Sequence, residues 1–157
     1  APAPSPPKTQ PPVAAAPKKA GLRQLALATY RVPEGLSGIR GQTDDDQLSR
    51  ATKAFSEKKY REALPMLETL PETDGTEALA LRAHALFNAG DFQAAARDFE
   101  ALEAGGIYRR EAQWFGLLAR MALPGADKNA LKAELEAIRQ TAGHPYQKEA
   151  ERLEREL

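Results

Sequence analysis

Residues 83–102, with the sequence AHALFNAGDFQAAARDFEAL, decide the fold of this chain because an earlier stretch repeats their pattern. Residues 51–70, ATKAFSEKKYREALPMLETL, align with them without a gap at a constant offset of 32. The matched positions share size and polarity: Ala51/Ala83, Phe55/Phe87, Tyr60/Phe92, Ala63/Ala95, Leu67/Phe99 and Leu70/Leu102. Self-similarity at a fixed period predicts a solenoid of stacked structural units.

A third copy of the pattern follows at an offset of 36, with Leu131, Leu135 and Ile138 in its second half. We expect the four extra residues to lie in residues 104–108, where two consecutive glycines interrupt the pattern. Tyr, Glu and Ala then recur between residues 108–112 and 146–150, which indicates one further helix at the C-terminal end.

Turn signals divide each copy into two helices. Asp91 and Asp127 stand where an N-cap accepts the first free amides of a helix. Gly90 and Gly125 stand where the preceding helix needs a left-handed stop. We therefore predict three helix pairs and a capping helix. The pairs are 44–57 with 60–70, 76–88 with 92–104, and 107–122 with 127–141, and the capping helix is 145–157.

These residues resemble the tetratricopeptide repeat (TPR) family over residues 44–140. The second copy carries the match in Gly90-Asp91-Phe92 and in the positions Ala95, Phe99 and Leu102 that follow it. The first copy departs from the family pattern at Lys58-Lys59, and the third has Lys128 in place of the aromatic residue. The resemblance implies an all-α fold, a right-handed superhelical stack of antiparallel helix pairs. This TPR-like solenoid would span residues 43–157, with about three repeats and the C-terminal capping helix.

The N-terminal region has a different composition. Seven of the 12 prolines lie in the first 17 residues, so residues 1–18 are predicted to be a Pro/Ala-rich flexible linker, either a spacer or a tail without a role. In residues 19–42, Leu22, Leu25 and Ala26 follow helical spacing over barely two turns. We interpret residues 19–42 as an N-terminal arm with a short helix that packs on the first repeat.

Composition argues against several classes of function. The 22 basic and 22 acidic side chains balance, so we expect no nucleic-acid partner. There is no cysteine, no Gly-rich phosphate loop and no paired-histidine motif, and the two histidines are isolated from other metal-binding side chains. We therefore predict no catalytic residue, no cofactor, no metal site and no small-molecule substrate.

The resemblance to TPR proteins also implies a binding surface, because the first helices of such repeats line the concave face. The residues expected to bind protein on that face are Thr52, Phe55, His84, Phe87, Asn88 and Arg120. Our hypothesis is that they receive a peptide or helix of a partner. In the alternative interpretation, Phe55 and Phe87 pack between helices or under the N-terminal arm.

The sequence thus predicts a non-catalytic protein–protein interaction scaffold. The alternatives are a self-association module and an accessory domain of a larger membrane-anchored protein. The whole chain also resembles the soluble region of bacterial membrane-tethered TPR proteins. That resemblance implies an extracytoplasmic (periplasmic) location with a membrane tether upstream of residue 1; a cytoplasmic location is the alternative.

Overall fold

Helices make up all the regular structure of the residues that the computed structural model describes, which are 21–39, 46–70, 75–106 and 108–157. The all-α prediction is therefore confirmed for these residues; the predicted linker at 1–18 lies outside them. The elements are α1 (Leu22–Thr29), the 3₁₀ helix η2 (Glu34–Gly38), α2 (Gln47–Ser56), α3 (Tyr60–Glu68), α4 (Gly75–Ala89), α5 (Phe92–Gly105), α6 (Arg109–Met121), α7 (Lys128–Gln140) and α8 (Gln147–Glu156).

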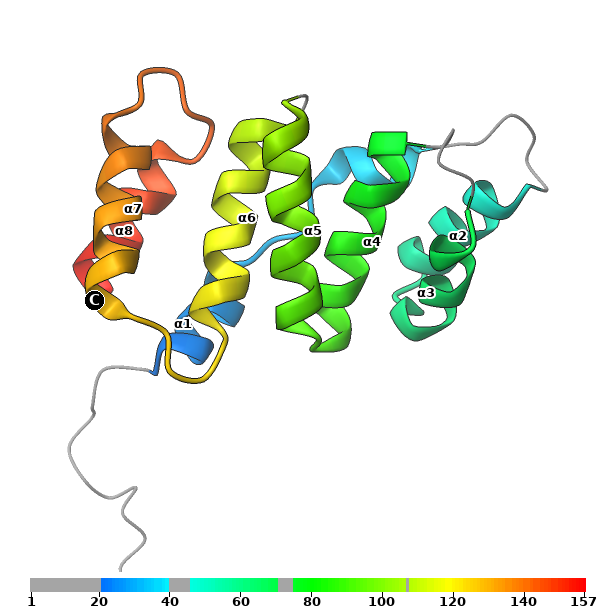
Figure 1. The fold of residues 1–157 in the computed structure, drawn as a ribbon, viewed down its shortest axis with the longest axis horizontal. Helices are drawn as coiled ribbons and strands as arrows, with labels where there is room; N and C mark the ends of the chain where they lie inside the picture. The colour runs from blue at the N-terminus through cyan, green and yellow to red at the C-terminus, as the bar shows by residue number, and fades with distance from the viewer. Residues whose placement is uncertain (1–20, 40–45, 71–74, 107) are drawn as a thin grey trace, which may run out of the picture.

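Helices α2 to α6 lie side by side in chain order, each packed against the next (Figure 1). The turn between α4 and α5 has two residues, so these neighbours run antiparallel. Asp91 caps α5 by accepting a hydrogen bond from the amide of Ala94 at 3.1 Å, and Asp127 caps α7 through the amides of Asn129 and Ala130. Gly90 has a φ of 90°, as the predicted left-handed stop requires.

The repeat seen in the sequence is also a repeat of contacts. Phe55 in α2 meets Tyr60 in α3 edge to face, with ring centroids 5.2 Å apart and planes at 74°. Phe87 in α4 meets Phe92 in α5 with centroids 5.1 Å apart and planes at 74°. Each matched pair thus joins the two helices of its unit in the same geometry, which confirms the offset of 32.

The four extra residues of the third copy lie elsewhere than expected. The turn between α6 and α7 spans residues 122–127, six residues, whereas the turn between α4 and α5 spans residues 90–91, two residues. The difference of four accounts for the change of offset from 32 to 36. The prediction that residues 104–108 hold the insertion was wrong, because the ends of α4 and α6, at Ala89 and Met121, are still 32 residues apart and the extra residues come after α6.

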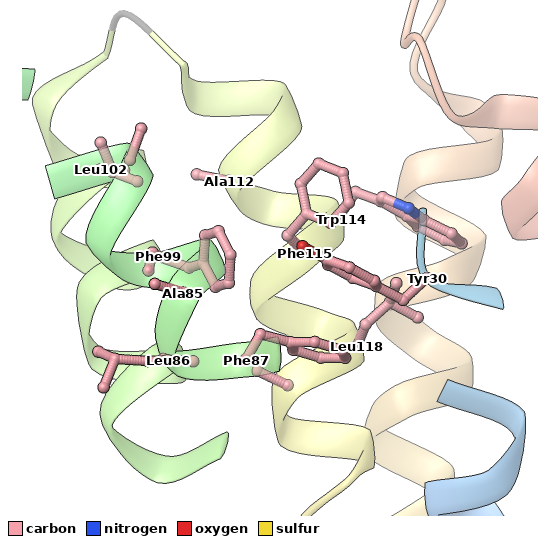
Figure 2. Close-up of a cluster of buried hydrophobic side chains, with 14 of the residues drawn as sticks. Tyr30, Ala85, Leu86, Phe87, Phe99, Leu102, Ala112, Trp114, Phe115 and Leu118 are labelled. Atoms are coloured by element: carbon pink, nitrogen blue, oxygen red, sulfur yellow. The ribbon is translucent and has the colours of Figure 1, made fainter. Parts of the chain in front are cut away.

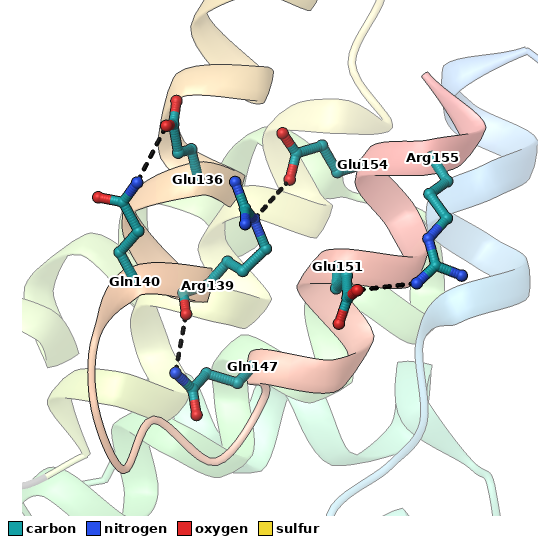
Figure 3. Close-up of polar contacts among 7 residues, drawn as sticks. All are labelled: Glu136, Arg139, Gln140, Gln147, Glu151, Glu154 and Arg155. Atoms are coloured by element: carbon teal, nitrogen blue, oxygen red, sulfur yellow. Dashed lines mark hydrogen bonds and ion pairs between the residues drawn. The ribbon is translucent and has the colours of Figure 1, made fainter.

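The predicted pairing of α6 with α7 is also corrected, because α7 packs mainly against α8. Polar contacts join these two helices (Figure 3): Arg139 donates to the Glu154 carboxylate at 3.0 Å, and Gln147 donates to the Arg139 carbonyl at 2.8 Å. The long turn after α6 allows α7 to move away from α6. Helix α1 contacts both α6 and α8.

Residues 21–39, which we name the strap, cross the row of helices. Helix α1 packs on α6 and α8, and η2 packs on α2 at the other end (Figure 1). The strap therefore runs opposite to the order of the helices, and the expectation that the arm packs on the first repeat holds only for η2. Its buried side chains are Ala26, Tyr30, Leu36 and Ile39.

The densest part of the core lies among α4, α5 and α6 (Figure 2). Phe99, Trp114 and Phe115 are its largest fully buried side chains. Gly116 permits the close approach of α5 and α6, since a Cβ atom there would lie 3.3 Å from the Cβ of Phe99. Helices of this length are marginal alone in water, so packing between neighbours supplies the stability of the row.

Candidate functional site

Tyr30 of the strap inserts into the face that α2, α4 and α6 present to it, which we name the strap face. Its ring stacks on Phe87 of α4, with centroids 4.1 Å apart and planes at 15° (Figure 2). The edge of Phe115 of α6 completes the aromatic contact, at a centroid distance of 5.6 Å. Only 8% of Tyr30 remains exposed. The strap face therefore already holds one aromatic side chain, from the link between α1 and η2.

The hydroxyl of Tyr30 ends in a small polar network. Its oxygen lies 2.7 Å from Nδ1 of His84, and the side-chain amide of Asn88 donates to that oxygen at 3.0 Å. The same amide donates to the His84 carbonyl at 2.7 Å, which requires a donor and so fixes the orientation of Asn88. With Asn88 donating to the hydroxyl oxygen, the arrangement that also gives the buried phenolic proton an acceptor has the hydroxyl donating to Nδ1, so that neutral His84 carries its proton on Nε2.

Burial keeps the histidine and tyrosine of this network uncharged. His84 is 4% exposed, and the loss of hydration lowers its pKa from 6.5 to about 3. Burial raises the pKa of Tyr30 well above its ordinary value, an effect that the hydrogen bond from Asn88 partly opposes. The contact between strap and helices is thus a neutral one at physiological pH.

We predict that acid weakens the fold through His84. Because the folded chain disfavours the charged ring, the unfolded chain binds more protons below pH 6.5, and stability falls as pH falls from 6.5 towards 3. The expected loss is about 1.4 kcal/mol per pH unit in that window. Urea denaturation at a series of pH values measures it.

The matched variants for this prediction are His84→Gln and His144→Gln. His84→Gln should flatten the pH dependence between 6.5 and 4. His144→Gln, which removes the other histidine, should leave the His84 contribution in place. An unchanged slope in His84→Gln would contradict the assignment.

The structure brings together three of the six residues predicted for the concave face. His84, Phe87 and Asn88 surround Tyr30. Thr52 and Phe55 lie buried on α2, where the Thr52 hydroxyl donates to the Leu48 carbonyl at 2.9 Å.

Arg120 lies outside the Tyr30 cluster and instead forms an ion pair with Glu134 of α7. Its assignment to the position equivalent to His84 used the offset of 36, whereas the ends of α4 and α6 are 32 residues apart. At that offset Gly116 matches His84.

Sequence reasoning missed Tyr30 and Phe115 as parts of this site. A signal for Tyr30 was present, because it is the only aromatic residue before Phe55 in the sequence. A large aromatic side chain that stands alone in a short arm needs a partner outside that arm to bury it. Phe115 carried no such signal, since it belongs to a copy whose register was misplaced.

A cavity of about 230 Å³ adjoins the Tyr30 network. The strap forms one wall of it, and α4, α5 and α6 form the others. Its lining residues are Pro33, Gly35, Leu36, Ile39, Ala80, His84, Phe99, Leu102, Tyr108, Glu111, Ala112 and Phe115. The surface is mostly apolar, with His84, Tyr108 and Glu111 as its polar side chains.

Within the described part of the chain, no group of three or more His, Asp or Glu side chains is placed to hold a metal ion. None of the described helices has the length and apolarity needed to span a bilayer. Comparison with protein-family models, with curated proteins and with solved structures found no match to this chain.

Proposed function

We propose that this chain is a non-catalytic protein-binding scaffold, a TPR-like right-handed superhelical stack whose concave face receives an extended segment of a partner protein. The observation that carries the proposal is the strap. It lies across α2, α4 and α6 as a peptide would, with a buried aromatic anchor. A surface that binds one segment of this kind has the chemistry to bind another.

The strap also indicates which segment the face prefers. The backbone is extended at both ends of the short link between α1 and η2, with ψ values of 135° at the anchor Tyr30 and 136° at Pro33. The anchor must be aromatic to stack on Phe87, and it needs a hydroxyl to satisfy His84 and Asn88. Buried polar groups left without partners are costly, so tyrosine should be favoured over phenylalanine.

A peptide supplied in trans tests the proposal. The full chain carrying Tyr30→Ala should bind a fluorescent peptide of residues 21–39 at least about tenfold more tightly than the wild-type chain does. The reason is that the wild-type strap occupies the face, whereas the variant strap has lost its anchor. Fluorescence anisotropy measures both affinities, and circular dichroism verifies that the variant is folded.

The matched control is the same peptide with its tyrosine, equivalent to Tyr30, replaced by alanine. It should bind about a hundredfold more weakly, since it lacks the ring and the hydroxyl. A Tyr30→Leu chain, which keeps apolar volume, provides a second receptor if Tyr30→Ala is too unstable. Equal binding of the two peptides would refute an aromatic-anchored peptide site.

A further inference from the structure

The cavity beside the Tyr30 network has an unused hydrogen-bond donor. Since Nδ1 of His84 accepts from Tyr30, its Nε2 carries a proton and has no partner among the described residues. Among the described residues, Nε of Arg120 is the side-chain nitrogen that is fully enclosed by protein and lacks a hydrogen-bond partner. Nε2 of His84 is not among the fully enclosed atoms, and His84 is one of the residues that line the cavity.

Aromatic surfaces flank that donor. The His84 ring lies against the edge-on pair of Phe99 and Phe115, at centroid distances of 4.9 Å and 4.6 Å and nearly perpendicular to both. All three residues line the cavity, together with the small side chains of Ala80 and Ala112. A flat ring can therefore contact aromatic walls and place a polar substituent near His84.

We propose that this cavity is a binding site for a small, uncharged phenol-like ring, enclosed between the strap and helices α4 to α6. The size fits, because an apolar cavity of about 150 Å³ accommodates benzene and this one measures about 230 Å³. The extra volume accommodates the substituents of the ring.

The polar side chains of the cavity select the substituent. A phenolic hydroxyl can accept a hydrogen bond from Nε2 of His84, and it can also donate one to a carboxylate such as Glu111. An anionic ring is disfavoured because the carboxylate of Glu111 belongs to the same lining. A ring without any polar group leaves the donor of His84 unsatisfied.

A bound ring has a consequence for the strap. Leu36 and Ile39 form part of the wall, so a ligand in the cavity contacts both the strap and the helices. A ligand that binds only when this wall is present stabilises the strap in place. The ligand proposal rests on the cavity with the strap in place, and it does not require that the strap face also bind a partner segment.

Three probes with the same methyl-substituted benzene ring test the site: p-cresol, toluene and 4-methylbenzoate. Each is titrated calorimetrically into the full wild-type chain at pH 7. We expect p-cresol to bind about tenfold more tightly than toluene and at least about tenfold more tightly than 4-methylbenzoate. Saturating p-cresol should also slow amide hydrogen exchange at Leu36 and Ile39. Equal binding of p-cresol and toluene, or no binding of p-cresol, would overturn the proposal.

Two variants locate the binding. Ala80→Met fills the cavity and should weaken the binding of p-cresol at least about tenfold. Ala101→Met, on the exposed side of α5, should leave the affinity for p-cresol unchanged. Glu111→Gln removes a negative charge and keeps the size of the side chain, so it should strengthen the binding of 4-methylbenzoate relative to that of p-cresol. If Ala80→Met and Glu111→Gln both leave the affinities unchanged, the ring binds elsewhere and the proposal is wrong.

Discussion

Tyr30→Ala is expected to lower the free energy of unfolding by about 3–5 kcal/mol, the loss typical of a large aromatic side chain removed from a core. The substitution removes the stack on Phe87 and leaves Nδ1 of His84 without its donor. Urea denaturation of the full chain measures the change. A loss this large is unusual for a residue outside the helices, and it reflects how deeply the strap is inserted.

Two variants separate the contributions of Tyr30. Tyr30→Phe keeps the ring and loses only the hydroxyl, so it should cost about 1–3 kcal/mol through the unpaired groups of His84 and Asn88. Val32→Ala changes a strap side chain that is 40% exposed and should cost less than about 0.5 kcal/mol. A cost for Tyr30→Ala as small as that of Val32→Ala would show that the strap is not anchored by its tyrosine.

Trp114→Ala should also destabilise the chain by about 3–5 kcal/mol, with the greatest effect on the C-terminal hairpin of α7 and α8. Trp114 is 1% exposed, and its ring stacks on Tyr146, just before α8, with centroids 5.3 Å apart and planes at 9°. This stack is one of the contacts that join α6 to the hairpin, in which α7 packs mainly on α8.

Denaturation and amide hydrogen exchange together test the role of Trp114. Exchange in α7 and α8 should accelerate more than exchange in α4 and α5, since the hairpin loses its attachment. Trp114→Phe retains an aromatic ring for Tyr146 and should have a smaller effect in both measurements. Uniform acceleration along the chain would mean that Trp114 stabilises the core without joining the hairpin to it.

The helices and their ends were predictable because they depend on neighbouring residues. Phe55 and Phe87, each followed five residues later by an aromatic partner, mark the two closest copies and make the same contact in the structure. Asp91 and Asp127 mark helix starts for the equally local reason that a carboxylate accepts the first free amides.

The path of the strap was not predictable from the same kind of evidence. Tyr30 and His84 are 54 residues apart, and no periodic pattern links the strap to the helices that it crosses. The predicted register of the third unit was wrong for a related reason. Gly105-Gly106 and Pro124-Gly125 are both turn signals, and only packing decides which turn takes the extra residues. The cluster around Tyr30 depends on both, because Tyr30 belongs to the strap and Phe115 belongs to the third unit.

The proposed scaffold function depends on the binding of an extended segment to the strap face through an aromatic anchor. The most direct test is the amide NMR spectrum of the ¹⁵N-labelled Tyr30→Ala chain, titrated with the unlabelled peptide of residues 21–39. We expect shifts concentrated in α4 from His84 to Asn88 and in α6 around Phe115, with α3 and α7 little changed. Shifts confined to α3 and α7, or no shifts at saturating peptide, would contradict it.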